Sequence, residues 1–170
     1  MQLDKSVLMG LLEQVDKELG MKIKLIAVGG TAMTLLDLKP STIDIDFDLS
    51  SEDAEELEMA LKTIPHGFRV DVFRDGMIFS QQLPVDYAGK CIDVKTSLEN
   101  IKLYALHPLD IVVTKIGRLN ERDLQDIRAC IEKFGLTKGQ IEKRANLVEY
   151  TGREENYRIN LQHVLGKFFG

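Results

Sequence analysis

The chain has 170 residues, 29% of them charged and 44% hydrophobic, and a formal net charge of -5. This composition is typical of a folded globular protein and excludes disordered and collagen-like chains. No stretch approaches the ~18–20 uninterrupted apolar residues of a membrane helix, and the N-terminal residues carry early acids, unlike a secretory signal. Cys91 and Cys130 lie far apart without a Cys-x-x-Cys motif, so we expect free thiols in a cytoplasmic protein.

The charge is distributed unevenly along the chain. Residues 1–100 carry 10 lysine and arginine against 18 aspartate and glutamate residues, a net of -8, whereas residues 101–170 carry 12 against 9, a net of +3. Such an asymmetry suits a protein that holds a cation with its carboxylates and attracts phosphate groups with its basic part, although chance alone can also produce it. The net negative charge argues against duplex DNA, sequence-specific or not, as a partner.

The first half of the chain alternates helical and extended patterns. Apolar residues at helical spacing predict a helix over 4–19, and a buried strand follows at 24–28 and ends at Gly29-Gly30. A short helix is expected over 31–37. From Ile43 to Asp48 apolar and acidic residues alternate, which predicts a strand with one acidic face.

A second group of elements follows this acidic strand. Ser50-Ser51 with Asp53 resembles a capping box, so we expect a helix to about residue 63. A strand over 68–73 would place Asp71 on the opposite face from Val70 and Val72. Shorter strands are expected at 76–80, 91–95 and 101–106.

The C-terminal part is predicted to be helical. Pro108 suits the first turn of a helix, His107 is placed to cap it, and Thr137 with Gln140 fits a capping box. Helices are expected over 108–118, 121–134, 138–150 and from about 154. The predicted organisation is an α/β body (1–107), a sheet with helices on it, and a helical segment (108–170) packed on it as one compact unit.

Two features of residues 27–49 predict chemistry. Gly29 and Gly30 lie between a strand and a helix, where the backbone can approach a phosphate group closely. Asp44 and Asp46 are two residues apart on a strand, so their carboxylates share one side and repel each other unless a cation lies between them. Carboxylates are hard oxygen ligands that suit Mg²⁺. Taken alone, the glycines can be a simple turn and the acids a solvated strand face.

The combination resembles the nucleotidyltransferase superfamily of the DNA polymerase β type. Gly29-Gly30-Thr31-Ala32 and Ser41-Thr42-Ile43-Asp44-Ile45-Asp46-Phe47 are most similar to its small AbiEii-like branch, which contains toxins of toxin–antitoxin pairs. Pro108-Leu109-Asp110-Ile111, Lys115, Arg118 and Arg122-Asp123-Leu124-Gln125-Asp126-Ile127 resemble a helical segment of that branch.

The resemblance implies a minimal nucleotidyltransferase fold, with a mixed sheet flanked by helices, and metal-dependent transfer of a nucleoside monophosphate. The donor would be a nucleoside triphosphate, and the acceptor a hydroxyl group of an RNA 3′ end, a protein side chain or a small molecule. The cofactor would be two Mg²⁺ ions, with Mn²⁺ as a substitute, and a cognate antitoxin would be a partner. The nucleotide-binding residues would be Gly29, Gly30, Thr31, Ser41, Lys115 and Arg118.

The third carboxylate has two candidates. The motif implies an acid on a later strand, and both Asp71 and Asp93 lie in apolar strand patterns. Asp71 follows the helix after the Asp pair, as the resemblance requires, so we predict Asp44, Asp46 and Asp71 as the catalytic and metal-binding set. Lys115 and Arg118 share one helix face and suit a triphosphate, with a solvated helix face as the alternative.

A non-catalytic function stays open at this stage. No arginine is found between Thr31 and Ser41, where many relatives carry one that contacts the triphosphate. The alternative is therefore a catalytically inactive module of the same fold that binds a nucleotide or a protein partner.

Overall fold

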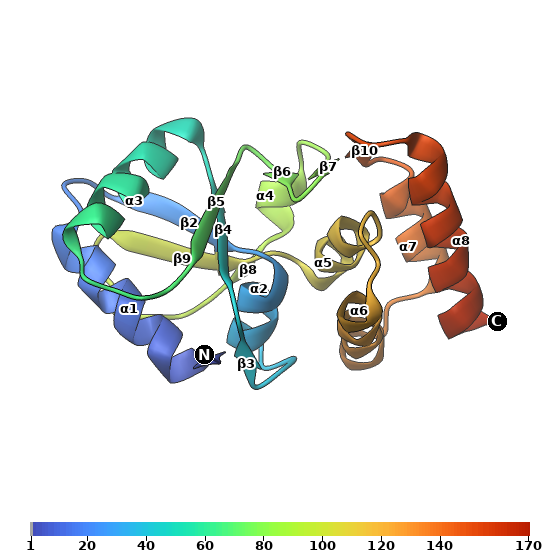
Figure 1. Cartoon of the computed structure of the whole chain (residues 1–170), viewed down its shortest axis with the longest axis horizontal. Helices are drawn as coiled ribbons and strands as arrows, with labels where there is room; N and C mark the ends of the chain where they lie inside the picture. The colour runs from blue at the N-terminus through green and yellow to red at the C-terminus, as the bar shows by residue number, and fades with distance from the viewer. Residues whose placement is uncertain (1) are drawn as a thin grey trace. The chain divides into compact units, whose positions relative to one another are not determined.

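The computed structural model describes residues 2–170 and divides the chain into two compact units. The first unit comprises the chain up to Asp75 together with Cys91–Ala105, and the second comprises Gly76–Lys90 and Leu106–Gly170 (Figure 1). The sequence pattern predicted a boundary near residue 107 and assigned residues 76–90 to the N-terminal body. In the structure this segment groups with the C-terminal helices instead.

The first unit is built on a mixed sheet. Its strands run in the order β5 (Val70–Arg74), β4 (Ile45–Leu49), β2 (Ile23–Ala27), β9 (Ile101–Ala105) and β8 (Ile92–Asp93). The β4–β5 and β2–β9 pairs are parallel, whereas the β2–β4 and β8–β9 pairs are antiparallel. The expected mixed α/β fold is therefore confirmed.

Helices α1 (Lys5–Glu18) and α3 (Ser51–Thr63) pack against each other, and α3 also packs against the sheet (Figure 1). The Asp4 carboxylate caps α1, and the Ser50 hydroxyl caps α3 by accepting from the Asp53 N–H, as the sequence predicted. Burial of their apolar faces forms the core of this unit. Its fully buried side chains include Leu8, Leu12, Leu25, Ile45, Phe47, Leu57 and Leu103.

Two boundaries near the predicted site are shifted. Helix α2 spans Gly29–Leu35, so it begins at the glycines rather than after them and ends because Asp37 adopts a left-handed φ of 60°. Strands β1 (Leu3–Asp4) and β3 (Ser41–Thr42) form a separate antiparallel pair. The acidic strand was predicted to begin at residue 43 but begins at Ile45, because the preceding carbonyl group bonds to threonine side chains rather than to a neighbouring strand.

The second unit combines a small antiparallel ladder with helices. β10 (Glu149–Tyr150) pairs with β7 (Gln81–Gln82), and β7 pairs with β6 (Met77–Ile78); the short helix α4 spans Tyr87–Lys90. The helix predicted over 138–150 is too long. It ends at Ala145, since the following residues leave the helix to pair with β7.

The helices of this unit are α5 (Pro108–Lys115), α6 (Glu121–Phe134), α7 (Lys138–Ala145) and α8 (Glu154–Phe169). The predicted cap at His107 is confirmed: its Nδ1 accepts from the Leu109 N–H at 3.0 Å. Capping boxes begin α6 and α7, the latter as predicted. None of the helices within residues 2–170 has the length and apolar character needed to cross a membrane.

Candidate active site

The glycine pair joins β2 to α2, and the two glycines are needed for different reasons. Gly29 has a φ of 54°, a left-handed conformation that favours glycine. A Cβ atom at Gly30 would lie 2.6 Å from the Thr42 Oγ1, closer than real Cβ atoms come to another heavy atom, and 3.1 Å from the Lys39 Nζ, which is the end of a flexible side chain. The turn is therefore shaped by its own backbone conformation at Gly29 and by close packing at Gly30.

The turn is joined to the acidic strand by two sets of hydrogen bonds. The Val28 N–H donates to the Asp46 carbonyl oxygen at 3.1 Å. The Thr31 hydroxyl, which is fully buried, accepts from the Asp46 N–H at 2.9 Å and donates to the Asp44 carbonyl oxygen at 3.3 Å. This hydroxyl thus fixes the backbone of both predicted metal ligands against the first turn of α2.

Asp46 and Asp71 are direct partners across the parallel pair β4–β5. Directly paired residues on neighbouring strands project from the same face of a sheet, so both carboxylates lie on one face. Asp46 is 7% exposed, and the next acid on that face, Asp48, is fully buried. The acidic face of β4 is therefore mostly buried, which overturns the alternative of a solvated strand face.

Asp44 lies just before β4, half-buried, and its carbonyl oxygen accepts from both the Thr31 and the Thr42 hydroxyls. Ser41 lies in β3, where it pairs with Asp4 and its hydroxyl donates to the Gln2 side chain at 3.1 Å. All the predicted site residues of the N-terminal body belong to the first unit.

The other candidate for the third carboxylate, Asp93, is separated from β4 by β2 and β9. Its carboxylate bonds to Lys102 at 3.1 Å and Lys95 at 3.3 Å, and these contacts hold the pKa of Asp93 below its usual value. Asp71 instead lies beside Asp46, and its carboxylate forms an ion pair with an exposed arginine, Arg69, at 3.4 Å. This geometry favours Asp71 as the third acid.

The carboxylates fit a magnesium ion that is shared with a phosphate ligand. Within residues 2–170, no three His, Cys, Asp or Glu side chains are placed to hold a metal ion by themselves. Mg²⁺ is commonly bound by one or two carboxylates, with substrate phosphates and water completing its octahedral shell. Asp46 and Asp71 offer such a pair.

A family model described as "Nucleotidyltransferase of unknown function (DUF6036)" matches residues 6–160. The chain belongs to this nucleotidyltransferase family. No curated protein sequence matches it. The match confirms membership of the nucleotidyltransferase superfamily, which the glycine pair and the Asp-x-Asp motif predicted, and it covers both units.

Two solved structures resemble the nucleotidyltransferase described here. An antigenic nucleotidyltransferase-like protein from Paracoccidioides brasiliensis has a TM-score of 0.63 and 17% sequence identity, over 99% of this chain and 91% of that chain. ANT(2")-Ia, in complex with adenylyl-2"-tobramycin, has a TM-score of 0.51 and 11% identity, over 95% of this chain and 98% of that chain. At these identities the likeness shows a common fold.

In this nucleotidyltransferase the predicted triphosphate contacts Lys115 and Arg118 belong to the second unit. The Lys115 side chain is 2% exposed, and its ammonium lies 3.0 Å from Asp126 and 3.5 Å from Asp123. Arg118 pairs with Asp123 at 3.1 Å, stacks on the Phe79 ring at 4.2 Å and is 46% exposed. Asp123 and Asp126 therefore form salt bridges within the second unit, and Lys115 does not lie on a solvated helix face.

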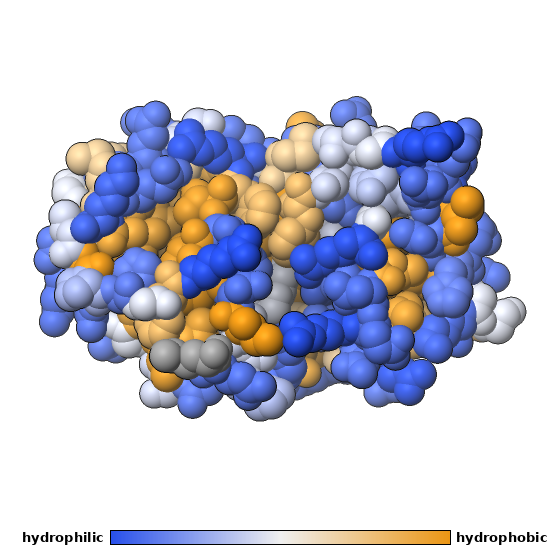
Figure 2. All heavy atoms as spheres, viewed as in Figure 1, coloured by the Kyte–Doolittle hydropathy of each residue, from blue (hydrophilic) through white to orange (hydrophobic). Residues whose placement is uncertain are grey.

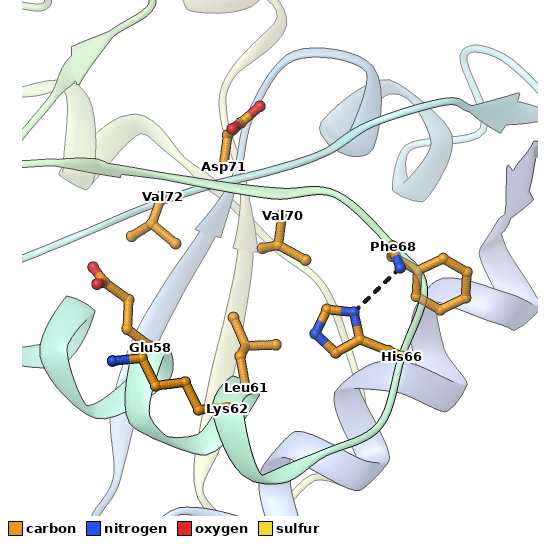
Figure 3. A pocket seen from close by; sticks show the side chains of 8 residues that line it. All are labelled: Glu58, Leu61, Lys62, His66, Phe68, Val70, Asp71 and Val72. Atoms are coloured by element: carbon orange, nitrogen blue, oxygen red, sulfur yellow. Dashed lines mark hydrogen bonds between the residues drawn. The ribbon is translucent and has the colours of Figure 1, made fainter.

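A groove of about 570 Å³ opens between α3 and β5 (Figure 3). Leu61, Val70 and Val72 line it, and His66 accepts a hydrogen bond from the Phe68 N–H at 3.2 Å. Figure 3 shows that Asp71 points from β5 away from Val70 and Val72, as the strand pattern predicted. Asp71 is also one of the residues that line the groove, but its carboxylate points to the other side of β5.

Apolar side chains also reach the surface of the first unit over α1 and α3 (Figure 2). The exposed large apolar residues of these two helices are Val7 (38%) and Met59 (63%).

Proposed function

We propose that the protein is a Mg²⁺-dependent nucleotidyltransferase that transfers a nucleoside monophosphate from a nucleoside triphosphate to a hydroxyl acceptor. The observation that carries this proposal is the direct pairing of Asp46 with Asp71, next to a glycine turn that is bonded to the same strand. Membership of a nucleotidyltransferase family supports the reaction class.

The reaction forms one bond and breaks another at the α-phosphorus. The acceptor oxygen bonds to this phosphorus, the bond to the bridging oxygen breaks, pyrophosphate leaves, and the acceptor proton passes to a carboxylate at the site. Bound Mg²⁺ supplies charge neutralisation for the phosphate oxygens and the leaving pyrophosphate. Mn²⁺ would substitute for it, because it also prefers carboxylate and water ligands.

Each predicted residue has a role in this proposal. Asp46 and Asp71 would hold Mg²⁺ together with the phosphate oxygens, Asp44 is the further ligand that the motif predicts, and the backbone around Gly29 and Gly30 would orient the phosphates. Thr31 positions the acids through its hydroxyl and Ser41 lies on the strand that leads to them. The role of Lys115 and Arg118 in binding the triphosphate stays a prediction from the sequence motif, and Arg118 is the more exposed of the two.

For the acceptor we propose an RNA 3′ end or a protein hydroxyl, as in a toxin of the AbiEii-like branch with a cognate antitoxin. The support is the motif resemblance in residues 29–47. The structural neighbour that carries adenylyl-2"-tobramycin makes a small-molecule hydroxyl the competing acceptor. Neither Cys91 nor Cys130 forms a disulfide within residues 2–170, which supports the cytoplasm as the proposed compartment.

The test is label transfer from each α-³²P-labelled nucleoside triphosphate, with Mg²⁺ and either total RNA or total protein as acceptor. We expect one triphosphate to label one acceptor class, and Asp46→Asn to abolish the transfer. Asp93→Asn is the matched control, because it removes a carboxylate from the same sheet at a distant strand, and it should retain activity.

The alternative is the inactive binding module. It is favoured by one observation: the Lys115 ammonium already has two carboxylate partners within the second unit. Nucleotide binding without label transfer to RNA, protein or aminoglycoside would support this module and contradict the transferase.

A further inference from the structure

A lysine that no motif singled out lies against the glycine turn. The Cβ position of Gly30 is 3.1 Å from the Nζ and 3.3 Å from the Cε of Lys39, so the ammonium end of this side chain contacts the first turn of α2. Lys39 is half-buried, and the Thr42 hydroxyl lies on the same side of Gly30, at 2.6 Å from that Cβ position. A cation and a hydroxyl thus meet over the glycine.

The end of α2 brings Lys39 back to the beginning of the helix. The Leu38 N–H donates to the Met33 carbonyl at 2.8 Å and the Asp37 N–H to the Thr34 carbonyl at 3.2 Å. With Asp37 in the left-handed conformation, these two bonds form a Schellman motif, which reverses the chain direction. Pro40 then keeps Lys39 extended, because the residue before a proline avoids the helical region.

The same turn adjoins the acids. The Thr42 hydroxyl, next to the Lys39 ammonium, donates to the Asp44 carbonyl oxygen at 2.9 Å, and the Val28 N–H binds the Asp46 carbonyl oxygen. Lys39 is therefore the cation of the first unit that is placed where the glycine turn meets the acidic strand. It is also the sole lysine or arginine among residues 31–43.

This placement has an electrostatic consequence. Asp44, Asp46 and Asp71 would repel the phosphates of an approaching nucleotide, and a positive charge beside Gly30 offsets part of that repulsion. The ammonium can also donate a hydrogen bond to a phosphate oxygen, and such charge-assisted hydrogen bonds are stronger than neutral ones.

We infer that Lys39 binds the β- or γ-phosphate of the nucleoside triphosphate and fills the place of the missing arginine between Thr31 and Ser41. This inference rests on the proposed function, since it names a further contact to the same donor substrate. It assigns Lys39 to substrate binding.

The test is titration calorimetry of the whole chain with Mg²⁺ and the triphosphate that supports label transfer, and with the corresponding monophosphate. Lys39→Met removes the charge and keeps the length, and we expect triphosphate affinity to fall about tenfold or more, while monophosphate affinity changes less than about twofold. Lys39→Arg keeps the charge and should keep most of the affinity. Lys22→Met is the matched control, because Lys22 is exposed and precedes β2 at the end away from Gly29.

The outcomes separate the inference from the proposed function. If the unaltered protein binds the triphosphate and Lys39→Met binds it equally well, Lys39 is not a phosphate ligand, and the proposed transferase is unaffected. Equal losses for the triphosphate and the monophosphate would also overturn the inference, since they indicate a general structural effect. If the unaltered protein binds no nucleoside triphosphate, both fail.

Discussion

Replacing Thr31 with valine tests whether one buried hydroxyl holds the two predicted metal ligands in place. Valine has nearly the same shape, so the change removes two hydrogen bonds and leaves the Asp46 N–H and the Asp44 carbonyl without this partner. The Asp44 carbonyl oxygen keeps its hydrogen bond from the Thr42 hydroxyl. The Asp46 N–H, which donates to the Thr31 hydroxyl at 2.9 Å, becomes a buried donor without that acceptor. A buried unsatisfied donor costs about 1–3 kcal/mol.

We therefore expect Thr31→Val to lower the free energy of unfolding by about 2 kcal/mol. Urea unfolding followed by circular dichroism should show a midpoint about 1 M lower, given a slope of roughly 2 kcal/mol/M for a protein of this size. Thr31→Ser keeps the hydroxyl and should lose only about 1 kcal/mol, the value of one buried methyl group.

Thr34 provides a matched control on the same helix. Its buried hydroxyl donates to the Gly30 carbonyl at 2.9 Å, an acceptor four residues earlier that also belongs to the helix. Thr34→Val should cost less than about 1 kcal/mol, because that carbonyl keeps its backbone partner. Equal midpoints for Thr31→Val and Thr34→Val would refute the assignment of Thr31 as the residue that positions the acids.

Three further outcomes are expected. Asp46→Asn should abolish the rise in melting temperature that Mg²⁺ causes, without lowering the melting temperature of the metal-free protein. Asp93→Asn should leave this rise intact. If Asp46→Asn still responds to Mg²⁺, Asp46 is a structural residue. Arg144→Met should destabilise the protein by about 3–5 kcal/mol in urea unfolding, because Asp110, 2.6 Å from the Arg144 Nε, becomes a buried charge without its main partner. Burial lowers the pKa of His107 from 6.5, so the imidazole takes up a proton less readily in the folded state than in the unfolded state. The neutral imidazole's contribution to the free energy of unfolding is therefore fully present above pH 6.5 and is lost as the pH falls towards the lowered pKa. His107→Asn, whose side chain can still cap the helix, should flatten this part of the plot of unfolding free energy against pH.

Local chemistry made much of the fold predictable. The caps at Ser50, His107 and Thr137 place helix beginnings through a side chain and a backbone N–H only a few residues apart, so their sequence pattern is sufficient. The alternation around Val70 likewise predicts which side Asp71 faces. The pairing of Glu149–Tyr150 with Gln81–Gln82 leaves no such pattern, because it joins two very short strands far apart in the chain.

In the candidate site, too, some features follow from local sequence and others only from how the elements pack. The glycines and the Asp pair form a compact motif, but the role of the Thr31 hydroxyl depends on how α2 packs against β4. The location of Lys39 depends on the left-handed backbone conformation of Asp37 at the end of α2. Glycine adopts this conformation far more often than aspartate does, so the sequence did not predict it here. The ion pairs of Lys115 involve residues of the next helix, so its burial could not be deduced from its own helix face.

The parallel register of β4 and β5 has a consequence for folding. Asp46 meets Asp71 only when β5 pairs with β4 after the whole of α3 has been placed between them. A fragment that ends before β5 would carry both glycines and the complete Asp-x-Asp sequence and still lack the carboxylate pair. Slippage of β5 by one residue would turn Asp71 towards α3 and the apolar side chains of the core. The capacity to bind the metal should thus appear late in folding, with the closure of a long-range strand pair, and its recovery would report correct register.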